Sequence, residues 1–205
     1  MGKTQTWIAL TTNTIMIMEK IVGFAGALIV ITGQVIYILN CLQRKITPSV
    51  LTWFGWAVLM CITLISQIIH GGWQWSMTAI AFSTVGCLAI AVVAWLSNNY
   101  SIRRNDLKFV AAGFGCVVVY VLSANPWATT IFAIISDALL GAPTIVKAWR
   151  EPAHERSVSW VLSMTSAVLA LLICIGHEII YFLFPAYLLL YNGTMVQMTW
   201  MRRQR

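Results

Sequence analysis

One acidic residue stands out because of its position in an apolar segment. Asp137 lies about ten residues into the run 127–149, so a helix would carry it to the middle of that run. A carboxylate at such a depth is energetically costly and tends to face a cavity or a partner. We therefore predict that Asp137 takes up a proton or a cationic substrate. The alternative is a protonated carboxyl group hydrogen-bonded to Ser136 or to a facing helix.

A second group of titratable residues lies where apolar runs end. His70 follows the run 49–69, and His177 and Glu178 close the run 158–176. Because histidine changes charge near neutral pH, these three residues could form a titrating outer gate. The more ordinary interpretation is that polar residues at such ends cap helices and meet water. We expect no bound metal and no cofactor, since the sequence holds no cluster with ligand spacing.

The segments that carry these residues are too apolar for a soluble protein. The chain of 205 residues is 60% hydrophobic and 9% charged, with a mean hydropathy of +0.81. Its apolar runs are about 18 to 23 residues long, which lets a helix cross roughly 30 Å of hydrocarbon. The sequence thus predicts an all-α integral membrane protein with seven transmembrane helices, over residues 21–42, 49–69, 77–96, 107–124, 127–149, 158–176 and 179–200.

The positive charge follows the expected topology of such a protein. Eleven of the 13 Lys and Arg residues fall in or directly beside the loops that follow the first, third and fifth predicted helices, or in the C-terminal tail. This positive-inside pattern predicts an outside N-terminus and a cytoplasmic C-terminus, as in a bacterial-type inner (plasma) membrane. The partner implied is the lipid bilayer and not a nucleic acid, which would need a basic soluble face. Homo-oligomer formation stays open.

The loop after the fifth predicted helix carries charges of both signs. Its charged residues are Lys147, Arg150, Glu151, Glu155 and Arg156. Most loops of this kind are solvated ion-pair patches of little energetic worth. The functional alternative is that the acidic and basic residues latch a cytoplasmic gate.

An internal repeat organises the helices. Three rare residue types recur at a shift of 107 residues: Trp53 with Trp160, His70 with His177, and Gly86 with Gly193. With a small change in loop length, Gly33-Gln34 also falls on Pro143-Thr144. The fourth helix belongs to neither copy and restores a parallel orientation. Two three-helix units should therefore be related by a pseudo-two-fold axis along the membrane normal, with a crevice between them.

This organisation divides the chain into five parts. They are an N-terminal tail (1–20), a first three-helix repeat (21–97), a cytoplasmic loop with the linker helix (98–126), a second repeat (127–200) and a basic C-terminal tail (201–205).

The arrangement of three, one and three helices resembles the SWEET and PQ-loop superfamily. The family motif is a Pro-Gln pair in the cytoplasmic half of the first and fifth helices, and Gly33-Gln34 and Pro143-Thr144 each keep half of it. The resemblance covers about residues 20–200. It implies that these two pairs are hinges for alternating access, because proline removes a backbone hydrogen bond and glycine loosens the backbone.

The resemblance also implies where a substrate would bind. In SWEET carriers, an asparagine on the third helix of each unit and a tryptophan on the second line the site. Asn192 is the candidate in the second copy, and its partner in the first copy is Val85, with Ser83 and Thr84 beside it. Trp56 is a pocket candidate if it faces inward. Alternatively, Trp56 belongs to an aromatic belt and Asn192 bonds a neighbouring helix.

Taken together, the sequence predicts a transporter that moves a small polar solute by alternating access, with Asp137 as the candidate for proton coupling. A sugar, an amino acid or a vitamin-like compound would fit that description. The alternative is a seven-helix receptor or accessory subunit that has the same fold and moves nothing. We do not expect an enzyme, since the sequence shows no nucleophile-base pattern and no phosphate-binding glycine loop.

Overall fold

The computed structural model describes residues 2–71, 77–123, 125–175 and 178–201. Within these ranges the fold is all-α, as predicted, and the isolated bridge between Ser49 and Ser101 is its one β-type contact. The elements in chain order are α1 (Gly2–Leu42), α2 (Val50–Gly71), α3 (Met77–Leu96), α4 (Asp106–Leu122), α5 (Pro126–Arg150), the 3-10 turn η1 (Pro152–Glu155), α6 (Ser159–Ile173), α7 (Ile179–Val196) and the π-helical turn η2 (Gln197–Met201).

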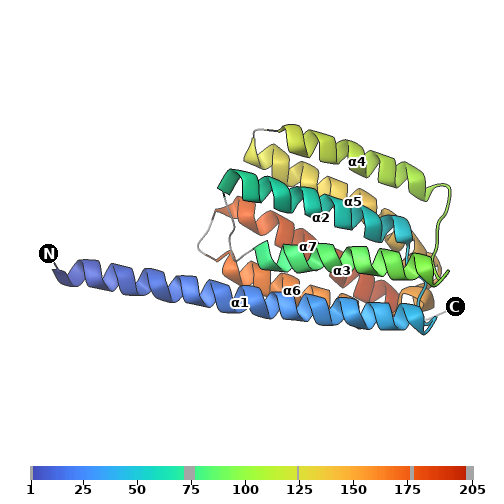
Figure 1. Ribbon diagram of the computed structural model, residues 1–205, viewed down its shortest axis with the longest axis horizontal. Coiled ribbons are helices and arrows are strands. Elements are labelled where there is room, and N and C mark those ends of the chain that lie inside the picture. The colour runs from blue at the N-terminus through green and yellow to red at the C-terminus, as the bar shows by residue number, and fades with distance from the viewer. Residues whose placement is uncertain (1, 72–76, 124, 176–177, 202–205) are drawn as a thin grey trace.

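Helices α2 to α7 lie where the apolar runs predicted them, whereas α1 is longer than expected. It begins at Gly2, so the backbone is helical through residues 2–20 of the segment that we expected to be a tail. The physical reason is the lack of a strong helix breaker, because the first proline of the chain is Pro48. As a result, the N-terminal part of α1 projects beyond the other helices (Figure 1).

The ends of the helices have identifiable local causes. Arg44 and Asn98 have positive φ angles of 54° and 49°, the left-handed conformation in which many helices terminate. The side chain of Asn125 accepts hydrogen bonds from the first free amides of α5, and Pro126 occupies its first position. These features place three turns of the chain between antiparallel helices.

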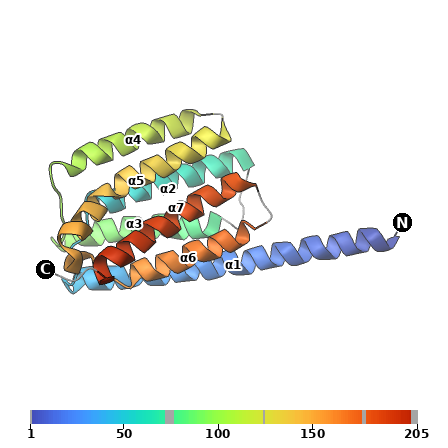
Figure 2. The same ribbon diagram turned by 180° about the vertical axis from the view of Figure 1, so that it is seen from behind.

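The helices pack in two triplets with the same internal order. In the first triplet α3 packs against both α1 and α2, and in the second α7 packs against both α5 and α6 (Figures 1 and 2). The triplets meet through α1 against α6 and through α2 against α5. If α1, α2 and α3 exchange places with α5, α6 and α7, each of these helix contacts becomes another of the contacts just described. A two-fold relation between the triplets has this effect. Helix α4 stands outside this pattern and packs against α5 and α2.

Several helices are compatible with a membrane protein. Four described segments are long and apolar enough to cross a bilayer, by length and composition: Ile17–Leu42, Thr78–Leu96, Trp127–Arg150 and Ile179–Met201. Two further apolar helices are shorter, Val50–Ile65 and Ser159–Ile173. Large apolar side chains such as Leu28, Val85 and Leu190 lie exposed on the outside of the bundle. Seven membrane crossings stay a prediction.

Candidate functional site

Five aromatic residues line the contact between the two triplets, and we call them the aromatic seam: Tyr37, Trp53, Trp56, Trp160 and Tyr191. All five are buried. The Trp53 and Trp160 ring centroids are 5.9 Å apart, and Trp53 also contacts Tyr37 at 4.7 Å and Trp56 at 5.2 Å. Trp53 and Trp160 are repeat-related in the sequence. Two equivalent residues can touch only close to the axis that relates their units, so the seam follows that axis.

The central acid lies deeper in the bundle, beyond the seam. Asp137 is 2% exposed, and its Oδ2 accepts a hydrogen bond of 2.7 Å from the Tyr187 hydroxyl group on α7. Its backbone carbonyl accepts a bond of 3.1 Å from the Trp56 indole. Ser136 donates instead to the Gly113 carbonyl on α4, at 2.9 Å. Of the partners considered for this carboxyl group, the structure therefore provides one on a facing helix and not Ser136.

A glycine lets the aromatic residues approach α5 between the seam and Asp137. The Tyr191 hydroxyl group donates to the carbonyl of Gly141 at 3.0 Å. A Cβ atom at Gly141 would lie only 2.6 Å from the Tyr191 hydroxyl oxygen and 2.8 Å from the Trp56 ring. Only glycine leaves room for this contact. Trp56 faces inward here, with its indole N–H directed at α5.

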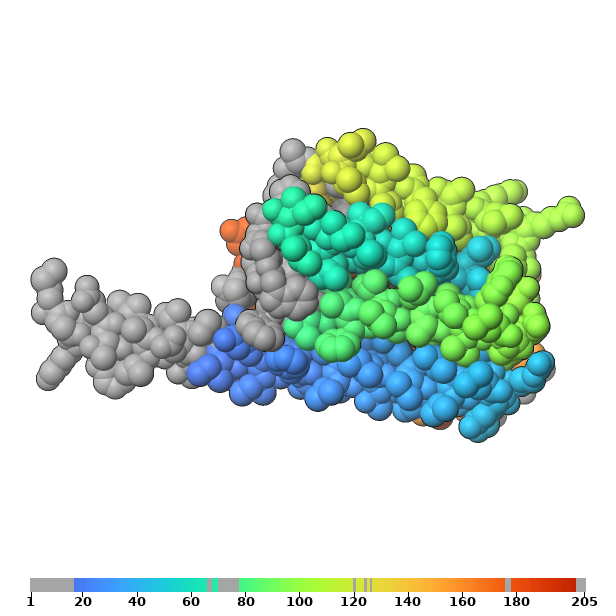
Figure 3. Space-filling view, in the orientation of Figure 1, coloured from blue at the N-terminus to red at the C-terminus, as the bar shows by residue number. Residues whose placement is uncertain are grey.

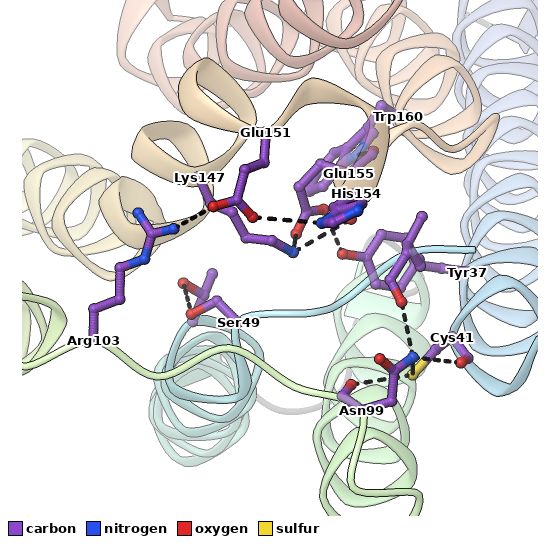
Figure 4. A network of polar contacts seen from close by, with 12 residues as sticks. Tyr37, Cys41, Ser49, Asn99, Arg103, Lys147, Glu151, His154, Glu155 and Trp160 are labelled. Carbon is purple, nitrogen blue, oxygen red and sulfur yellow. Dashed lines mark hydrogen bonds and ion pairs between the residues drawn. The ribbon is translucent and has the colours of Figure 1, made fainter. Parts of the chain in front are cut away.

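At the end of the bundle that carries the basic loops, a buried carboxylate joins the two triplets. Glu155 is 0% exposed, and its Oε1 and Oε2 contact the Lys147 ammonium at 2.9 Å and the Tyr37 hydroxyl group at 2.6 Å (Figure 4). Its backbone carbonyl accepts a bond of 3.0 Å from the Trp160 indole. We call Tyr37, Lys147, Glu155 and Trp160 the basic-end seal. These residues come from α1, α5, η1 and α6, so their contacts join both triplets at the end with the basic loops.

The electrostatics of the seal are those of a buried ion pair. Burial raises the pKa of the Glu155 carboxyl group, whereas the Lys147 ammonium and the Tyr37 hydroxyl group act in the opposite direction. Such a pair is held by its hydrogen bonds, and removing one partner leaves an uncompensated charge in the interior. Protonation of Glu155 would leave the Lys147 ammonium without its counter-charge. The net charge of the seal therefore changes with the pH.

The charged loop that we considered a solvated patch is divided between two environments. Lys147 and Glu155 are buried, so for this pair the solvated interpretation was wrong. The interpretation holds for Glu151, which is partly exposed and pairs with Arg103 at 2.7 Å and with His154 at 3.4 Å (Figure 4). The difference arises because η1 places the Glu155 side chain against Tyr37 of α1, where it is buried.

Backbone and amide hydrogen bonds tie the loops at this end into one layer. The Thr47 amide donates to the His154 carbonyl at 3.0 Å, which joins the loops that follow α1 and α5. Asn99, after α3, donates from its side chain to the carbonyls of Cys41 and Ile46 at 2.7 and 2.9 Å. The end of the bundle near the seal is thus closed by loops from both triplets.

The other predicted substrate contacts do not gather around Asp137. Asn192 is buried but donates to Leu188 within its own helix, at 2.7 Å. The Thr84 hydroxyl group likewise bonds back within α3. Ser83 accepts from the Gln34 side chain on α1. The bonds from Gln34 to Ser83 join α1 to α3, whereas the other two lie within a single helix. None of them extends to the central acid.

The two residues that the sequence repeat pairs, Val85 and Asn192, lie in different surroundings. Val85 is 67% exposed on the outer face of α3, whereas Asn192 is 6% exposed. Their equivalence as repeat partners stays a prediction.

The four predicted hinge residues all lie at packed contacts. The Gly33 carbonyl accepts a bond of 2.7 Å from Ser159, so this glycine marks a close approach of α1 and α6. Gln34 bonds to α3, as described above. Pro143 is buried inside α5, which stays helical as far as Arg150. Within the described part of the chain, the buried Thr144 hydroxyl group has no hydrogen-bond partner. Hinge motion stays a prediction.

The predicted outer gate is only partly described. Glu178 is exposed immediately before α7, and its side chain makes no capping hydrogen bond. His177 and the side chain of His70 lie outside the described residues. Across the described ranges, no three His, Cys, Asp or Glu side chains come together as a metal site would require.

Sequence reasoning missed the tyrosines of this region. Tyr187 and Tyr191 are four residues apart and point from one face of α7 into the bundle, a spacing that could have indicated a shared face. Tyr37 falls on Lys147 in the register that pairs Gly33 with Pro143. An aromatic residue within an apolar run is otherwise indistinguishable from one that faces lipid.

No family model, curated protein or solved structure matches the chain.

Proposed function

We propose that this chain is a membrane transporter of the SWEET and PQ-loop type, which moves a small polar solute by alternating access between two three-helix units. The observation that carries the proposal is the contact of the repeat-related Trp53 and Trp160 at 5.9 Å, on the seam where the triplets meet. Two units that meet along an axis can tilt relative to each other, which opens one end while closing the other.

The outside of the bundle supports placement in a bilayer. Its exposed apolar side chains and its four candidate spans suit a hydrocarbon solvent, whereas the described charged residues other than Asp137 lie towards the ends of the bundle. We propose seven crossings of a bacterial-type inner membrane, with the basic loops in the cytoplasm.

In this conformation, transport would start from the end opposite the basic loops. Along α5, Lys147 belongs to the seal, Gly141 contacts the seam, and Asp137 lies beyond both. A solute would therefore reach Asp137 only from the other end. The second state of the cycle would require the seal and the Trp53–Trp160 contact to separate.

Asp137 and Tyr187 are the proposed proton site. The Tyr187 hydroxyl group can donate to the ionised carboxylate, and after protonation the same carboxyl group can donate in return. In the described part of the chain, no cation pairs with Asp137. Loss or gain of one proton therefore changes the net charge of the interior, which can bias the two conformations differently.

The test is uptake by the purified chain in liposomes, with a panel of labelled sugars, amino acids and vitamins, in the presence and absence of a pH gradient. We expect at least one solute to accumulate with the gradient and Asp137→Asn to abolish the stimulation. Glu151→Gln is the matched control, since Glu151 is a partly exposed acid on the loop. Unchanged stimulation in Asp137→Asn would remove the coupling proposal.

The same experiment separates the transporter from the receptor or accessory subunit. A solute that raises the thermal stability of the protein and is not taken up by the liposomes would favour the receptor. Uptake that is lost in Pro143→Ala or Asn192→Ala, with binding retained, would favour the transporter.

A further inference from the structure

The interior of the bundle is packed in one half and accessible in the other. No described residue is buried on α7 before Tyr191, on α5 before Ser136, or on α2 after Leu59. These stretches cover every face of their helices, because one turn takes 3.6 residues, so the inward faces stay partly exposed. We call this part, away from the basic loops, the open half. On the side of the bundle shown in Figure 3, α1, α3 and α2 lie against one another and form one of its walls.

Asp137 lies at the inner limit of the open half, next to Ser136, the first buried residue of α5. The Tyr187 hydroxyl group donates to its Oδ2 at 2.7 Å, and Oδ1 accepts no hydrogen bond from any described residue. Within the described ranges, no Lys, Arg or His side chain pairs with this carboxyl group. A carboxylate at such a depth requires a proton or a cation as its partner. The site therefore favours a positively charged ligand.

Aromatic rings from two helices lie next to this carboxyl group. Phe184, Tyr187 and Tyr191 follow one another on one face of α7, with ring centroids 5.9 and 6.1 Å apart. Trp56 of α2 contacts Tyr191 at 5.5 Å and donates from its indole to the Asp137 carbonyl at 3.1 Å. The faces of such rings attract organic cations, and aromatic cages are a common means of recognising ammonium groups.

A sugar would fit this site less well. Each of its hydroxyl groups needs a hydrogen-bond partner once it is buried. The amide and hydroxyl side chains that were predicted to meet a substrate bond elsewhere: Asn192 and Thr84 within their own helices, and Ser83 with Gln34. One carboxyl group and several rings match instead a ligand that has one positive charge and an apolar surface.

We propose that the open half binds a small organic cation, whose ammonium group lies against Asp137 and whose carbon atoms contact the rings of Tyr187 and Phe184. The inference rests on the proposed function and names its class of solute.

The organic cation and the proton compete for the same carboxyl group, so that binding of one displaces the other. The other titratable groups in electrostatic reach of Asp137 are Tyr187 and Tyr191 of α7 and Cys87 of α3. These three side chains are uncharged near neutral pH, so they supply no competing charge.

Chemically matched probes test the requirement for charge. Binding of labelled choline to the full-length chain in detergent is compared with that of the neutral alcohol in which a carbon atom replaces the choline nitrogen. Ethanolamine is a second cation with a smaller head group. We expect at least one of the two cations to bind about tenfold more tightly than the alcohol, because only a cation gains from both the carboxylate and the rings.

Two pairs of variants separate the charge from the rings. Asp137→Asn should remove the preference for the cation, and Glu151→Gln, a partly exposed acid of the loop after α5, should keep it. Phe184→Leu should weaken cation binding about threefold, as the loss of one ring contact implies. Phe82→Leu is its control, since Phe82 is 45% exposed on α3.

The pH dependence of the wild type provides a test that needs no variant. Cation binding should weaken as the pH falls, by about tenfold per pH unit once Asp137 is protonated, while binding of the alcohol should not change. Three results would overturn the inference. They are equal binding of both cations and the alcohol, a preference that persists in Asp137→Asn, and cation binding that stays constant down to the pH at which an exposed aspartate takes up its proton.

Failure of this inference can be told apart from failure of the proposed function. A cation that binds with this pH dependence and is not taken up by liposomes would count against the transporter alone. Proton-driven uptake of a neutral solute, with neither cation bound, would overturn the inference and leave the transporter in place.

Discussion

Glu155 shows how much a single side chain can depend on its surroundings in this molecule. It lies in a loop rich in charge, yet it is buried and bonded by Lys147 of its own triplet and by Tyr37 of the other. A hydrogen-bonded carboxylate of this kind costs free energy to bury, and its partners offset part of that cost. We therefore expect the residue to control the contact between the triplets at the basic end.

The pH dependence of stability should reveal this residue. Because its pKa is raised above the ordinary value of 4.5, the folded protein binds this proton more tightly than the unfolded chain does. The contribution of Glu155 to folding is thus fully present below pH 4.5 and is lost as the pH rises through the raised pKa. The melting temperature of the wild type, measured in detergent by circular dichroism, should fall through that window relative to Glu155→Gln.

Glu151→Gln is the control for this measurement, because Glu151 lies on the same loop and is partly exposed. It should leave the pH profile of the wild type unchanged. Profiles of wild type and Glu155→Gln that run parallel at all pH values would contradict the assignment.

At the scale of single residues, the sequence predicted which groups are unusual but not their partners. Asp137 was predicted as a mid-helix acid, and the structure places its side chain against Tyr187. Position in an apolar run is a property of the sequence alone. Which facing helix supplies a hydroxyl group depends on the packing of distant segments, so the tyrosine could not be predicted.

At the scale of helices, the lengths of the apolar runs and the positions of the prolines predicted α2 to α7 closely. Helix α1 was the exception, because mixed polarity before Ile21 suggested an end where no helix breaker exists. Contacts between helices were less predictable. The close approach at Gly141 requires that α2, α5 and α7 meet at one point, which no local pattern specifies.

Two glycine substitutions test this close approach. Gly141→Ala should lower the free energy of unfolding by about 1–3 kcal/mol, because the new methyl group overlaps Tyr191 and Trp56. Gly115→Ala is the matched control on α4, where a Cβ atom meets nothing within 4 Å. It should be neutral or stabilising by up to about 1 kcal/mol, as alanine favours helices. Denaturant titration followed by tryptophan fluorescence measures both, and equal effects would contradict the packing argument.

At the scale of the whole molecule, the repeat in the sequence and the packing of the triplets agree in form. The order of helices is the same in both triplets, and the contacts between them exchange as a two-fold relation requires. What the sequence did not predict is that the axis is lined by aromatic residues and closed at one end. Which end is closed depends on contacts between loops that are distant in the sequence, and composition says nothing about those contacts.

The orientation in the membrane can be tested directly with fused reporters. With basic loops in the cytoplasm, a fluorescent protein fused after Arg205 should fluoresce in a bacterial host, and alkaline phosphatase at this position should be inactive. Phosphatase inserted between α2 and α3 should be active, because Gly71 and Met77, which flank the insertion, lie at the opposite end of the bundle. The reverse result at both positions would overturn the orientation.

The basic-end seal also bears on the ancestry of the chain. Tyr37 and Lys147 occupy equivalent positions of the two copies and bind the same carboxylate, while the first copy has no acid in its loop 43–49. A homodimer of the first copy would offer two tyrosines and no glutamate, and one of the second copy would crowd two glutamates and two lysines together. A single shared carboxylate between the halves is therefore available to two copies that have diverged and not to two identical copies.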